Sequence, residues 1–228
     1  MNEPALVSVI VPVRNAATHL PKALASVQSQ KPGPAEVIVI DGGSTDDSVA
    51  IAQAHGTRVI HQEGRGLAAA RNQAIHACRH PWIAFCDADD RWADDALAIR
   101  MRALQANPSA WAVIGQVVRE QLAGTEATAA QLEQVGRPVP GFTPGALIAH
   151  RTAFERIGFF DESLAIGTDS DWFIRLQESP HPAIQVESVV LYKGARGTSL
   201  SSDVQAYRRE LLTVARRFIG RRRTNPNP

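Results

Sequence analysis

Short runs of apolar, β-branched residues alternate with helix-forming segments through the first hundred residues of the chain. The runs have the length and composition of buried parallel strands, and they cover residues 6–13, 36–41, 57–62 and 82–86. Between them, the sequence predicts helices over 20–27, 46–54 and 64–78. Strands separated by helices of about ten residues form βαβ units and a parallel sheet. The alternation therefore predicts an α/β fold with helices flanking a mostly parallel sheet.

The second half of the chain follows a less regular pattern. Helices and strands are predicted over 96–108, 110–120, 168–179 and 183–194. The stretch 145–162 contains a further strand and a helix, which is capped near Thr152 and stopped at Gly158. Residues 121–140 are polar and interrupted by glycine and proline, so no element is predicted there.

Length and composition limit the kinds of protein that this chain can be. Its 228 residues are enough for one sizeable domain, or for two halves that share a continuous core. Hydrophobic residues make up 44% and charged residues 21%, as is ordinary for soluble globular proteins. No apolar run reaches the ~20 residues of a transmembrane helix, and the N-terminus has no basic signal-peptide region. These features predict a cytoplasmic location.

The last segment, 207–228, carries seven arginines and one glutamate, so the rest of the chain is net acidic although the total charge is +1. A basic helix and tail of this kind can bind an anionic membrane surface or an acidic partner. The plainer interpretation is a solvated helix followed by a frayed end. The sequence leaves both interpretations open, and it predicts no nucleic-acid partner.

Polar residues follow three of the predicted strands at the point where each strand ends. Arg14 and Asn15 follow the first strand, Asp41 ends the second, and Asp87 and Asp89 follow the fourth. In open α/β sheets, ligands bind beyond the carboxyl ends of the strands. The sequence therefore predicts a polar ligand along this edge of the sheet.

Three carboxylates, at Asp87, Asp89 and Asp90, crowd the exit of the fourth strand. Adjacent like charges repel, and burial makes the repulsion worse. Asp87 and Asp89 alternate along the chain and can face one ligand, and Mg²⁺ uses one or two carboxylates together with substrate phosphates. A metal-bridged nucleotide diphosphate would bring the positive charge that makes this crowding tolerable. The alternative is a helix cap, which is the role expected for Asp90 and for the following Asp94 and Asp95.

Two further segments have residues suited to a nucleotide site. Asp41 precedes Gly42 and Gly43, and its carboxylate can bond a nucleobase imide or a ribose hydroxyl, or serve as a turn residue. The glycine-rich entry to the third helix supplies Arg65 and Arg71 for phosphate or base contacts. This entry lacks the order G-x-G-x-x-G and also lacks G-K-S/T, which excludes a dinucleotide fingerprint and a P-loop.

A second acidic cluster, Asp169 and Asp171, begins the helix predicted over 168–179. Aspartate at a helix N-terminus is electrostatically favourable, so an acidic cap explains at least one of the two. Their side chains diverge, and one of them can act as a general base if it reaches a substrate hydroxyl. The histidines are scattered without the spacing of a Ser-His-Asp triad or a metal site, and none is assigned a role.

Taken together and in this order, the segments VSVIVPVRN, VIVIDGGSTDDS, GRGLAAARNQAI, WIAFCDADD, IGFFDE and GTDSDWFIRL resemble the inverting glycosyltransferases of family 2. The resemblance covers roughly residues 6–195. It implies a GT-A-like fold, in which a nucleotide-binding half is fused to an acceptor-binding half. The expected domain spans 1–206, with its halves at about 1–100 and 101–206, and the basic C-terminal helix and tail follow over 207–228.

The resemblance also implies how a donor nucleotide-sugar is held. Pro12, Val13 and Arg14 would line the nucleobase pocket, and many relatives carry a tyrosine at the position of Val13. Further donor contacts would come from Asp41 at the base, Arg71 against the nucleotide, and Asp87, Ala88 and Asp89 at the ribose, diphosphate and metal. UDP is the most frequent nucleotide in the family, with dTDP and GDP as alternatives.

Metal binding and catalysis are implied for the aspartates. Asp89, together with Asp87, would bind Mn²⁺ or Mg²⁺. The family's catalytic base is the Asp of a Glu-Asp pair that precedes an aromatic, apolar helix, and the match puts Asp169 at this position. Thr168 stands where the Glu usually lies, so Asp171 is an alternative base.

The implied reaction transfers a sugar from the nucleotide-sugar to an acceptor hydroxyl with inversion. The base removes the acceptor proton, and the metal with nearby cations stabilises the departing diphosphate. Relatives often carry an R-x-H stretch near the end of the domain, where this chain offers Lys193 or Arg196 instead. Residues 121–140 would help to bind the acceptor, which is a glycan, a lipid-linked glycan, a small molecule, or a peptide or protein.

Two other functions fit parts of the same sequence. A sugar-phosphate nucleotidyltransferase of similar architecture would need a glycine- and lysine-rich loop after the first strand, which PVRNAATHLPK does not supply. A non-catalytic domain that binds a nucleotide-sugar or a partner protein needs no base, whereas Asp41, Asp89 and Asp169 are all present. The sequence therefore favours an enzyme, a glycosyltransferase of the hexosyltransferase type.

Overall fold

The computed structural model describes residues 5–121, 135–195 and Val214. Three sequence-based expectations concern residues outside this part of the chain. They are the diphosphate contact of Arg196, the acceptor role of most of the segment 121–140, and the basic helix and tail over 207–228 apart from Val214.

The first half of the chain forms parallel strands joined by helices, as the alternation in the sequence predicts. The strands are β1 (Ala5–Val13), β2 (Pro34–Asp41), β3 (Arg58–His61) and β4 (Trp82–Phe85). β1 lies between β2 and β4, and β3 pairs with the other edge of β2. The register of the central pair sets Val13 beside Asp41, so both strands end at the same edge of the sheet.

Three helices connect these strands: α1 (Leu20–Gln28), α2 (Ser48–Ala54) and α3 (Gly66–Ala77). In α1, Leu20, Leu24 and Val27 are fully buried, which confirms the helical spacing read from the sequence. Pro21 lies in the first turn of this helix, where its missing N–H group costs no hydrogen bond.

The second half of the chain extends the same sheet with mixed strand directions. Its strands are β6 (Ala112–Gln121), β8 (Leu147–His150) and β9 (Ile184–Ala195). β8 runs antiparallel to both β4 and β6, and β9 runs parallel to β6. The nine-stranded sheet has the order β3-β2-β1-β4-β8-β6-β9-β5, with β7 paired to β6. The sheet is therefore mixed. Neighbouring strands are parallel throughout β3-β2-β1-β4, and antiparallel pairs follow between β4 and β8 and between β8 and β6.

Three short elements are absent from the sequence-based prediction. They are β5 (Arg91–Trp92), β7 (Val139–Pro140) and the 3₁₀ turn η1 (Pro144–Ala146). The two strands span two residues each, which is too short for the alternation that identifies a strand. β5 exists because its two residues pair with Tyr192 and Leu191 of β9, about a hundred residues further along the chain.

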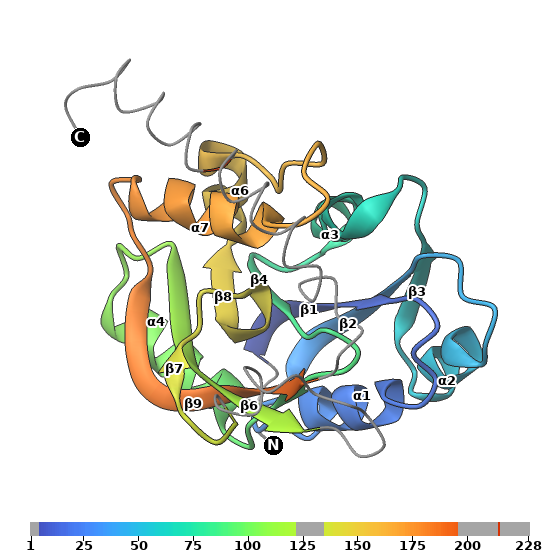
Figure 1. Ribbon diagram of the computed structural model, residues 1–228. Helices are drawn as coiled ribbons and strands as arrows, with labels where there is room; N and C mark the ends of the chain where they lie inside the picture. Colours follow the sequence, from blue (N-terminus) through green and yellow to red (C-terminus); the bar gives the residue numbers. More distant parts are fainter. Residues whose placement is uncertain (1–4, 122–134, 196–213, 215–228) are drawn as a thin grey trace.

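Helices cover both faces of the sheet (Figure 1). One core layer packs α1, α2 and α4 (Ala96–Ala106) against the strand side chains Val9, Val11 and Val39. The other packs α3, α6 (Arg151–Ile157) and α7 (Thr168–Gln177) against Ile10 and Phe85. Because successive strand residues point to opposite faces, β1 contributes to both layers.

The ends of α6 and α7 differ in part from the predictions. His150 is the N-cap of α6, and its Nδ1 accepts a hydrogen bond from Thr152 N, so the cap lies two residues before the predicted position. Gly158 ends α6 with φ of 96°, which confirms the predicted stop. The acidic start predicted for α7 is confirmed in part. Asp169 and Asp171 lie in its first turn, where negative charge is favourable, but the N-cap residue itself is Gly167.

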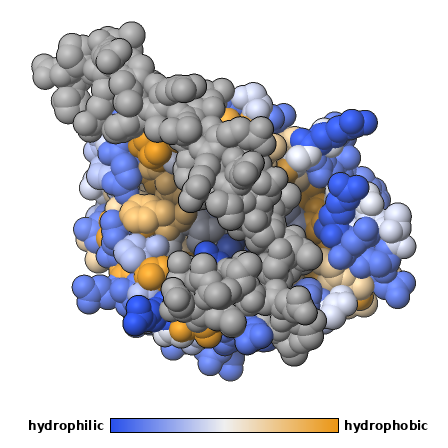
Figure 2. Space-filling view, in the orientation of Figure 1, coloured by the Kyte–Doolittle hydropathy of each residue, from blue (hydrophilic) through white to orange (hydrophobic). Residues whose placement is uncertain are grey.

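The surface of the described chain is mostly polar. Figure 2 shows mostly hydrophilic residues around the rim of this face, with smaller hydrophobic areas on both its left and its right side. Among the described residues, the exposed large hydrophobic side chains are those of Leu6, Val135, Val139 and Phe142. Among the helices of the described residues, none has the length and apolar character needed to cross a membrane.

Candidate active site

The site lies beyond the carboxyl ends of β1, β2 and β4, where the N-terminus of α7 also arrives. Asp169 of α7 and Asp87, which follows β4, accept hydrogen bonds from the same arginine, although they are far apart in the sequence. The predicted polar edge of the sheet is therefore present. It is extended by a helix from the second half of the chain.

The β1 and β2 corner of this edge is held by Asp41. Its carboxylate is 3% exposed and accepts hydrogen bonds from Gly43 N (3.3 Å) and Ser44 N (3.1 Å). His61 Nδ1 lies 3.5 Å from Asp41 Oδ2. The carboxylate thus holds the turn after β2, while its side chain stays at the edge where a nucleotide is expected.

The other residues expected at the nucleobase have different exposures. Val13 is buried, Pro12 is half-buried and Arg14 is exposed, so only the last two offer side-chain surface to a ligand. Asn15, which follows them, has φ of 50° and accepts a hydrogen bond from Thr45 N at 2.8 Å. This hydrogen bond joins the loop after β1 to the loop after β2.

Arg71 links the donor side of the site to α7. Its guanidinium donates from Nη2 to Asp87 Oδ1 (2.9 Å) and from Nη1 to Asp169 Oδ1 (2.6 Å), and its side chain is 1% exposed. It lies over the rings of Phe85 and Phe160, at 6.0 and 5.6 Å from their centroids. Burial opposes the charge, but Asp169 and then Asp87 raise the pKa of Arg71 above its ordinary value. The cation is therefore retained inside the protein.

Two of the three crowded carboxylates after β4, Asp87 and Asp90, form ion pairs with cations of the protein itself. Lys193 Nζ lies 3.5 Å from Asp90 Oδ2 and 3.8 Å from Asp87 Oδ2, and Arg71 bonds the other oxygen of Asp87. The sequence-based expectation that a bound ligand must bring the positive charge is therefore wrong in part, because Lys193 and Arg71 already supply it.

The predicted capping role of Asp90 is also wrong. Its side chain is 1% exposed, and Oδ1 accepts a hydrogen bond from Gly194 N at 2.9 Å, so it points to β9 and away from α4. Burial raises the pKa of Asp90, Lys193 opposes this effect, and Asp87 adds to it. In turn, Asp90 is the largest cause that raises the pKa of Lys193. The pair joins the exit of β4 to the end of β9.

The two candidate bases have different surroundings. Asp171 is 4% exposed, and its Oδ2 accepts a hydrogen bond from Arg175 Nε at 2.8 Å. Arg175 also donates to the carbonyl oxygens of Ile157, Gly158 and Phe159, so this ion pair fastens α7 to the end of α6. Asp169 is 33% exposed and faces the site. The geometry favours Asp169 over Asp171 as a group that a substrate can reach.

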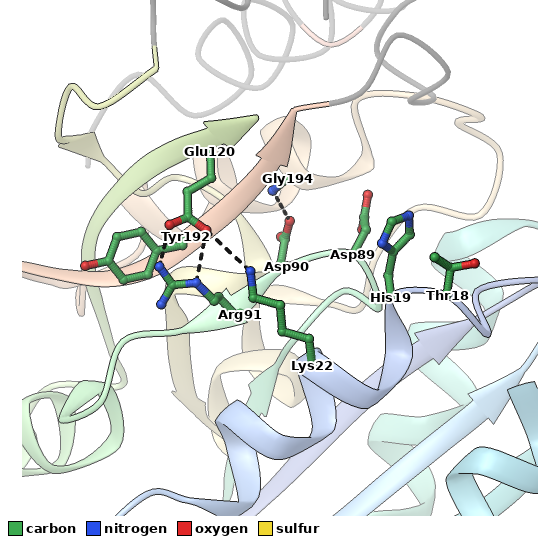
Figure 3. Close-up of a pocket in the computed structure, with 9 residues that line it drawn as sticks. All are labelled: Thr18, His19, Lys22, Asp89, Asp90, Arg91, Glu120, Tyr192 and Gly194. Carbon is green, nitrogen blue, oxygen red and sulfur yellow. Dashed lines mark hydrogen bonds and ion pairs between the residues drawn. The ribbon is translucent and has the colours of Figure 1, made fainter. Parts of the chain in front are cut away.

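A pocket adjoins Asp89 on the side of α1 (Figure 3). In this view Lys22 and Arg91 converge on Glu120. The lining residues are Thr18, His19, Lys22, Asp89, Asp90, Arg91, Glu120, Tyr192 and Gly194.

Most of this pocket was not predicted from the sequence. Arg91 forms an ion pair with Glu120, and its guanidinium carbon lies 3.6 Å from the centroid of the Tyr192 ring. The three residues come from β5, β6 and β9, so their proximity depends on strand pairing across the sheet. No local spacing in the sequence indicates it.

The carboxylates at the exit of β4 fit a hard divalent cation. Asp87 and Asp89 supply oxygen atoms, and Ala88 between them is small and buried. Among the described residues, no group of three or more His, Cys, Asp or Glu side chains could hold a metal ion. A cation here would therefore need further oxygen ligands, such as the phosphates of a substrate.

Comparison with known families gives a match across most of the chain. The family model described as Glycosyl transferase family 2 matches residues 8–167. The chain is 30% identical, over 244 aligned residues, to the succinoglycan biosynthesis protein ExoU of Rhizobium meliloti (strain 1021), and the match covers 95% of this chain and 70% of that protein. It is 41% identical over 95 residues to the putative glycosyltransferase EpsH of Bacillus subtilis (strain 168), with 40% of this chain and 27% of that protein covered.

Solved structures share the fold of this chain at low sequence identity. S. aureus TarS 1-349 in complex with UDP-GlcNAc has a TM-score of 0.68 and 19% identity, over 86% of this chain and 60% of that chain. The glucosyl-3-phosphoglycerate synthase from Mycobacterium tuberculosis, in complex with Mn²⁺, UDP and phosphoglyceric acid, has a TM-score of 0.68 and 21% identity, over 94% of this chain and 78% of that chain. Both likenesses show a GT-A fold.

Proposed function

The chain belongs to glycosyl transferase family 2, and from this premise we propose that it transfers a sugar from a UDP-sugar to an acceptor hydroxyl with inversion, using Asp169 as the general base. That it is a glycosyltransferase follows from the family. The donor, the stereochemistry and the base are the parts proposed here. UDP is chosen because TarS and the synthase from Mycobacterium tuberculosis were solved with UDP or a UDP-sugar bound.

One observation carries the proposal: Arg71 holds Asp87 and Asp169 in a single site. Asp87 comes from the strand exit where a nucleotide-sugar is expected, and Asp169 comes from the second half of the chain. An inverting transfer needs a donor on one side and a carboxylate near the acceptor hydroxyl on the other. A domain that only binds a nucleotide-sugar has no need of the second carboxylate.

The donor would lie along the ends of β1, β2 and β4. Pro12, Arg14 and Asp41 would meet the nucleobase, with Val13 packed behind them. The ribose and diphosphate would lie over the segment from Asp87 to Asp89. The exposed side chain of Arg14 and the position of Asp89 at the pocket support the proposal.

Asp89 and Asp87 would hold Mn²⁺ or Mg²⁺ at this exit. When bound, the cation would stabilise the negative charge of the diphosphate. Lys193 would add a second positive charge, because its ammonium already lies beside Asp87 and Asp90. Asp169 would accept the proton of the acceptor hydroxyl, and its partial exposure supports this role.

The acceptor is proposed only as a class of molecules that carry a free hydroxyl: a glycan, a lipid-linked glycan, a small molecule, or a peptide or protein. A nucleotide-binding half over about 1–100 and an acceptor half over 101–206 stay part of the proposal. So do a cytoplasmic location and contact with a membrane surface through the basic segment 207–228. A lipid-linked acceptor would be met at such a surface.

Thermal unfolding with a panel of nucleoside diphosphates and their sugars, with and without Mn²⁺, tests the donor. A ligand at a hundred times its Kd stabilises the folded state by about 2.7 kcal/mol, which should raise Tm by about 5–10 °C for a chain of this size. We expect the largest shift for UDP and a UDP-sugar with Mn²⁺. Asp89→Ala should remove the Mn²⁺-dependent part of the shift. A panel in which no nucleotide-sugar raises Tm would contradict the proposal.

A further inference from the structure

We propose that Arg71 is a positioning residue that sets the place of the Asp169 carboxylate relative to the donor, through Asp87. The inference rests on the function proposed above. Arg71 does not make a bidentate bond to one carboxylate, but donates from Nη1 to Asp169 and from Nη2 to Asp87. The two nitrogens belong to one planar, rigid group, so the two accepting oxygens are held at a fixed separation.

The support of Arg71 is itself rigid. The residue lies in the middle of α3, and its side chain is almost fully buried against the rings of Phe85 and Phe160. Phe85 ends β4, and Phe160 belongs to the same core layer. The core therefore holds the guanidinium in place. Through its two hydrogen bonds, the guanidinium fixes Asp169 in the first turn of α7 relative to Asp87 at the exit of β4.

Asp169 has little else to fix it. It lies in the first turn of α7, behind Gly167 with φ of 80°, and this N-cap glycine has no side chain that could cap the helix. Its other hydrogen bond comes from the neighbouring Thr168 Oγ1, at 3.2 Å. Both bonds go to Oδ1. Within the described part of the chain no hydrogen bond to Oδ2 occurs, which leaves this oxygen for the acceptor proton.

This role differs from the nucleotide contact that the resemblance implies for Arg71. A side chain that is 1% exposed offers almost no surface to a nucleotide. A positioning residue acts on turnover, because a base that is misplaced by about 1 Å can cost roughly a hundredfold in rate. A nucleotide contact acts on donor affinity. Loss of a positioning residue should therefore lower kcat with little change in donor affinity. Loss of a nucleotide contact should lower donor affinity with little change in kcat.

The variant Arg71→Lys distinguishes the positioning role from the nucleotide contact. Lysine keeps the charge but places it on a single nitrogen, which cannot donate to two carboxylates at the fixed separation set by the guanidinium. We expect the kcat for hydrolysis of UDP-glucose or UDP-N-acetylglucosamine to fall about 10- to 100-fold, and the Kd for UDP with Mn²⁺ to change less than about threefold. Arg102→Lys is the matched control: Arg102 is exposed on α4, within the described part of the chain it donates a hydrogen bond to a carbonyl oxygen of its own helix, and its replacement should leave both values unchanged. A tenfold higher Kd with an unchanged kcat would overturn the positioning role.

A double variant tests whether Arg71 acts through Asp169. If it does, Arg71→Lys should reduce kcat by less than about threefold in the Asp169→Asn background, because the group that it positions is already lost. Independent effects that multiply in the double variant would count against the proposal.

Hydrogen exchange of the unaltered protein tests the connection even if the Arg71 variants do not fold. UDP with Mn²⁺ engages the Asp87 side, so the backbone amides of the first turn of α7 should exchange more slowly when both are added. Binding of UDP that leaves this turn unchanged would overturn the positioning role while the proposed function stands. Absence of any nucleotide binding or donor hydrolysis by the unaltered protein would overturn the proposed function and this inference together.

Discussion

Lys193 Nζ lies 3.5 Å from Asp90 Oδ2, so an ammonium at the end of β9 neutralises a buried carboxylate at the exit of β4. The neighbouring Gly194 N donates to the other oxygen of Asp90 at 2.9 Å. The pairing of β5 with β9 brings the two residues together, although they lie far apart in the sequence. Their contact connects the proposed donor site to the strand that borders the pocket.

Lys193→Met should therefore destabilise the fold, because it leaves the Asp90 carboxylate buried without a counter-ion. Removing one partner of a fully buried pair costs about 3–5 kcal/mol, and the partial exposure of Lys193 lowers the expected cost to about 2 kcal/mol. Urea unfolding at pH 7 measures this change. Lys193→Met with Asp90→Asn should recover about half of the loss, and a single variant as stable as the parent would contradict the ion pair.

Glu36 should account for part of the loss of stability in acid. Burial alone would raise its pKa, but hydrogen bonds from Arg79 N, Ser8 Oγ and Arg58 lower the pKa of Glu36 below its ordinary value near 4.5. A carboxylate whose pKa is lowered by folding stabilises the protein above its unfolded pKa, and the contribution is lost as pH falls through the folded pKa.

Glu36→Gln should accordingly cost about 1–3 kcal/mol at pH 7 and progressively less below about pH 4.5. Free energies of unfolding measured in urea between pH 7 and pH 3 give both values. Since Glu36 lies at the start of β2, at the opposite end of the strand from Asp41, nucleotide binding should not change. A pH profile parallel to that of the parent would contradict the assignment.

Elements with a local signature could be predicted from the sequence. β1, β2 and α1 are identified by runs and spacings of apolar residues within about ten positions, and the structure confirms them. The grouping of Asp41 and Asp87 at one edge was also predictable, because parallel strands that follow one another along a sheet end on the same side.

Contacts made by strand pairing between distant segments could not be predicted in this way. Asp90 was expected to cap the next helix because its nearest sequence signal is local, whereas its actual partners, Lys193 and Gly194, lie on β9. The pair of Arg91 and Glu120 likewise depends on β5 and β6 both lying beside β9. The sequence offers no local spacing for such pairs.

A larger residue in place of Gly141 should destabilise the fold, because the backbone of Gly141 packs closely against β6. A Cβ atom there would lie 2.5 Å from Ala146 Cβ and 2.8 Å from Val117 Cγ2, and would also meet the carbonyl oxygen of Gly115. Gly141→Ala should cost about 2–3 kcal/mol in urea unfolding, because the backbone oxygen cannot turn away as a side chain can. Gly33→Ala is the control: its nearest atom, Gln30 O, lies 3.5 Å away, and stability should change by less than about 0.5 kcal/mol. Equal losses in both variants would contradict the close packing.

Substitution of Asp171 should mainly lower stability and substitution of Asp169 should mainly lower turnover, although the two residues lie two positions apart in one helical turn. Asp171 is buried in an ion pair with Arg175, which also bonds three carbonyl oxygens at the end of α6. Asp171→Asn should therefore lower the free energy of unfolding by about 1–2 kcal/mol, because a charge-assisted hydrogen bond is weakened. Turnover per folded molecule should stay within about threefold of the parent, since the carboxylate does not face the site.

Asp169→Asn should have the opposite effect. Asparagine keeps an oxygen that can accept from Arg71, Arg71 still pairs with Asp87, and Asp169 is 33% exposed where Asp171 is 4% exposed, so the free energy of unfolding should change by less than about 1 kcal/mol. It cannot take a proton at neutral pH, so turnover should fall by about 10²- to 10⁴-fold, the usual contribution of a general base, while UDP still binds. Transfer measured once an acceptor is known, together with urea unfolding of both variants, checks the pair of outcomes. If Asp171→Asn were the variant that loses turnover while Asp169→Asn keeps it, Asp171 would be the base and Asp169 would not.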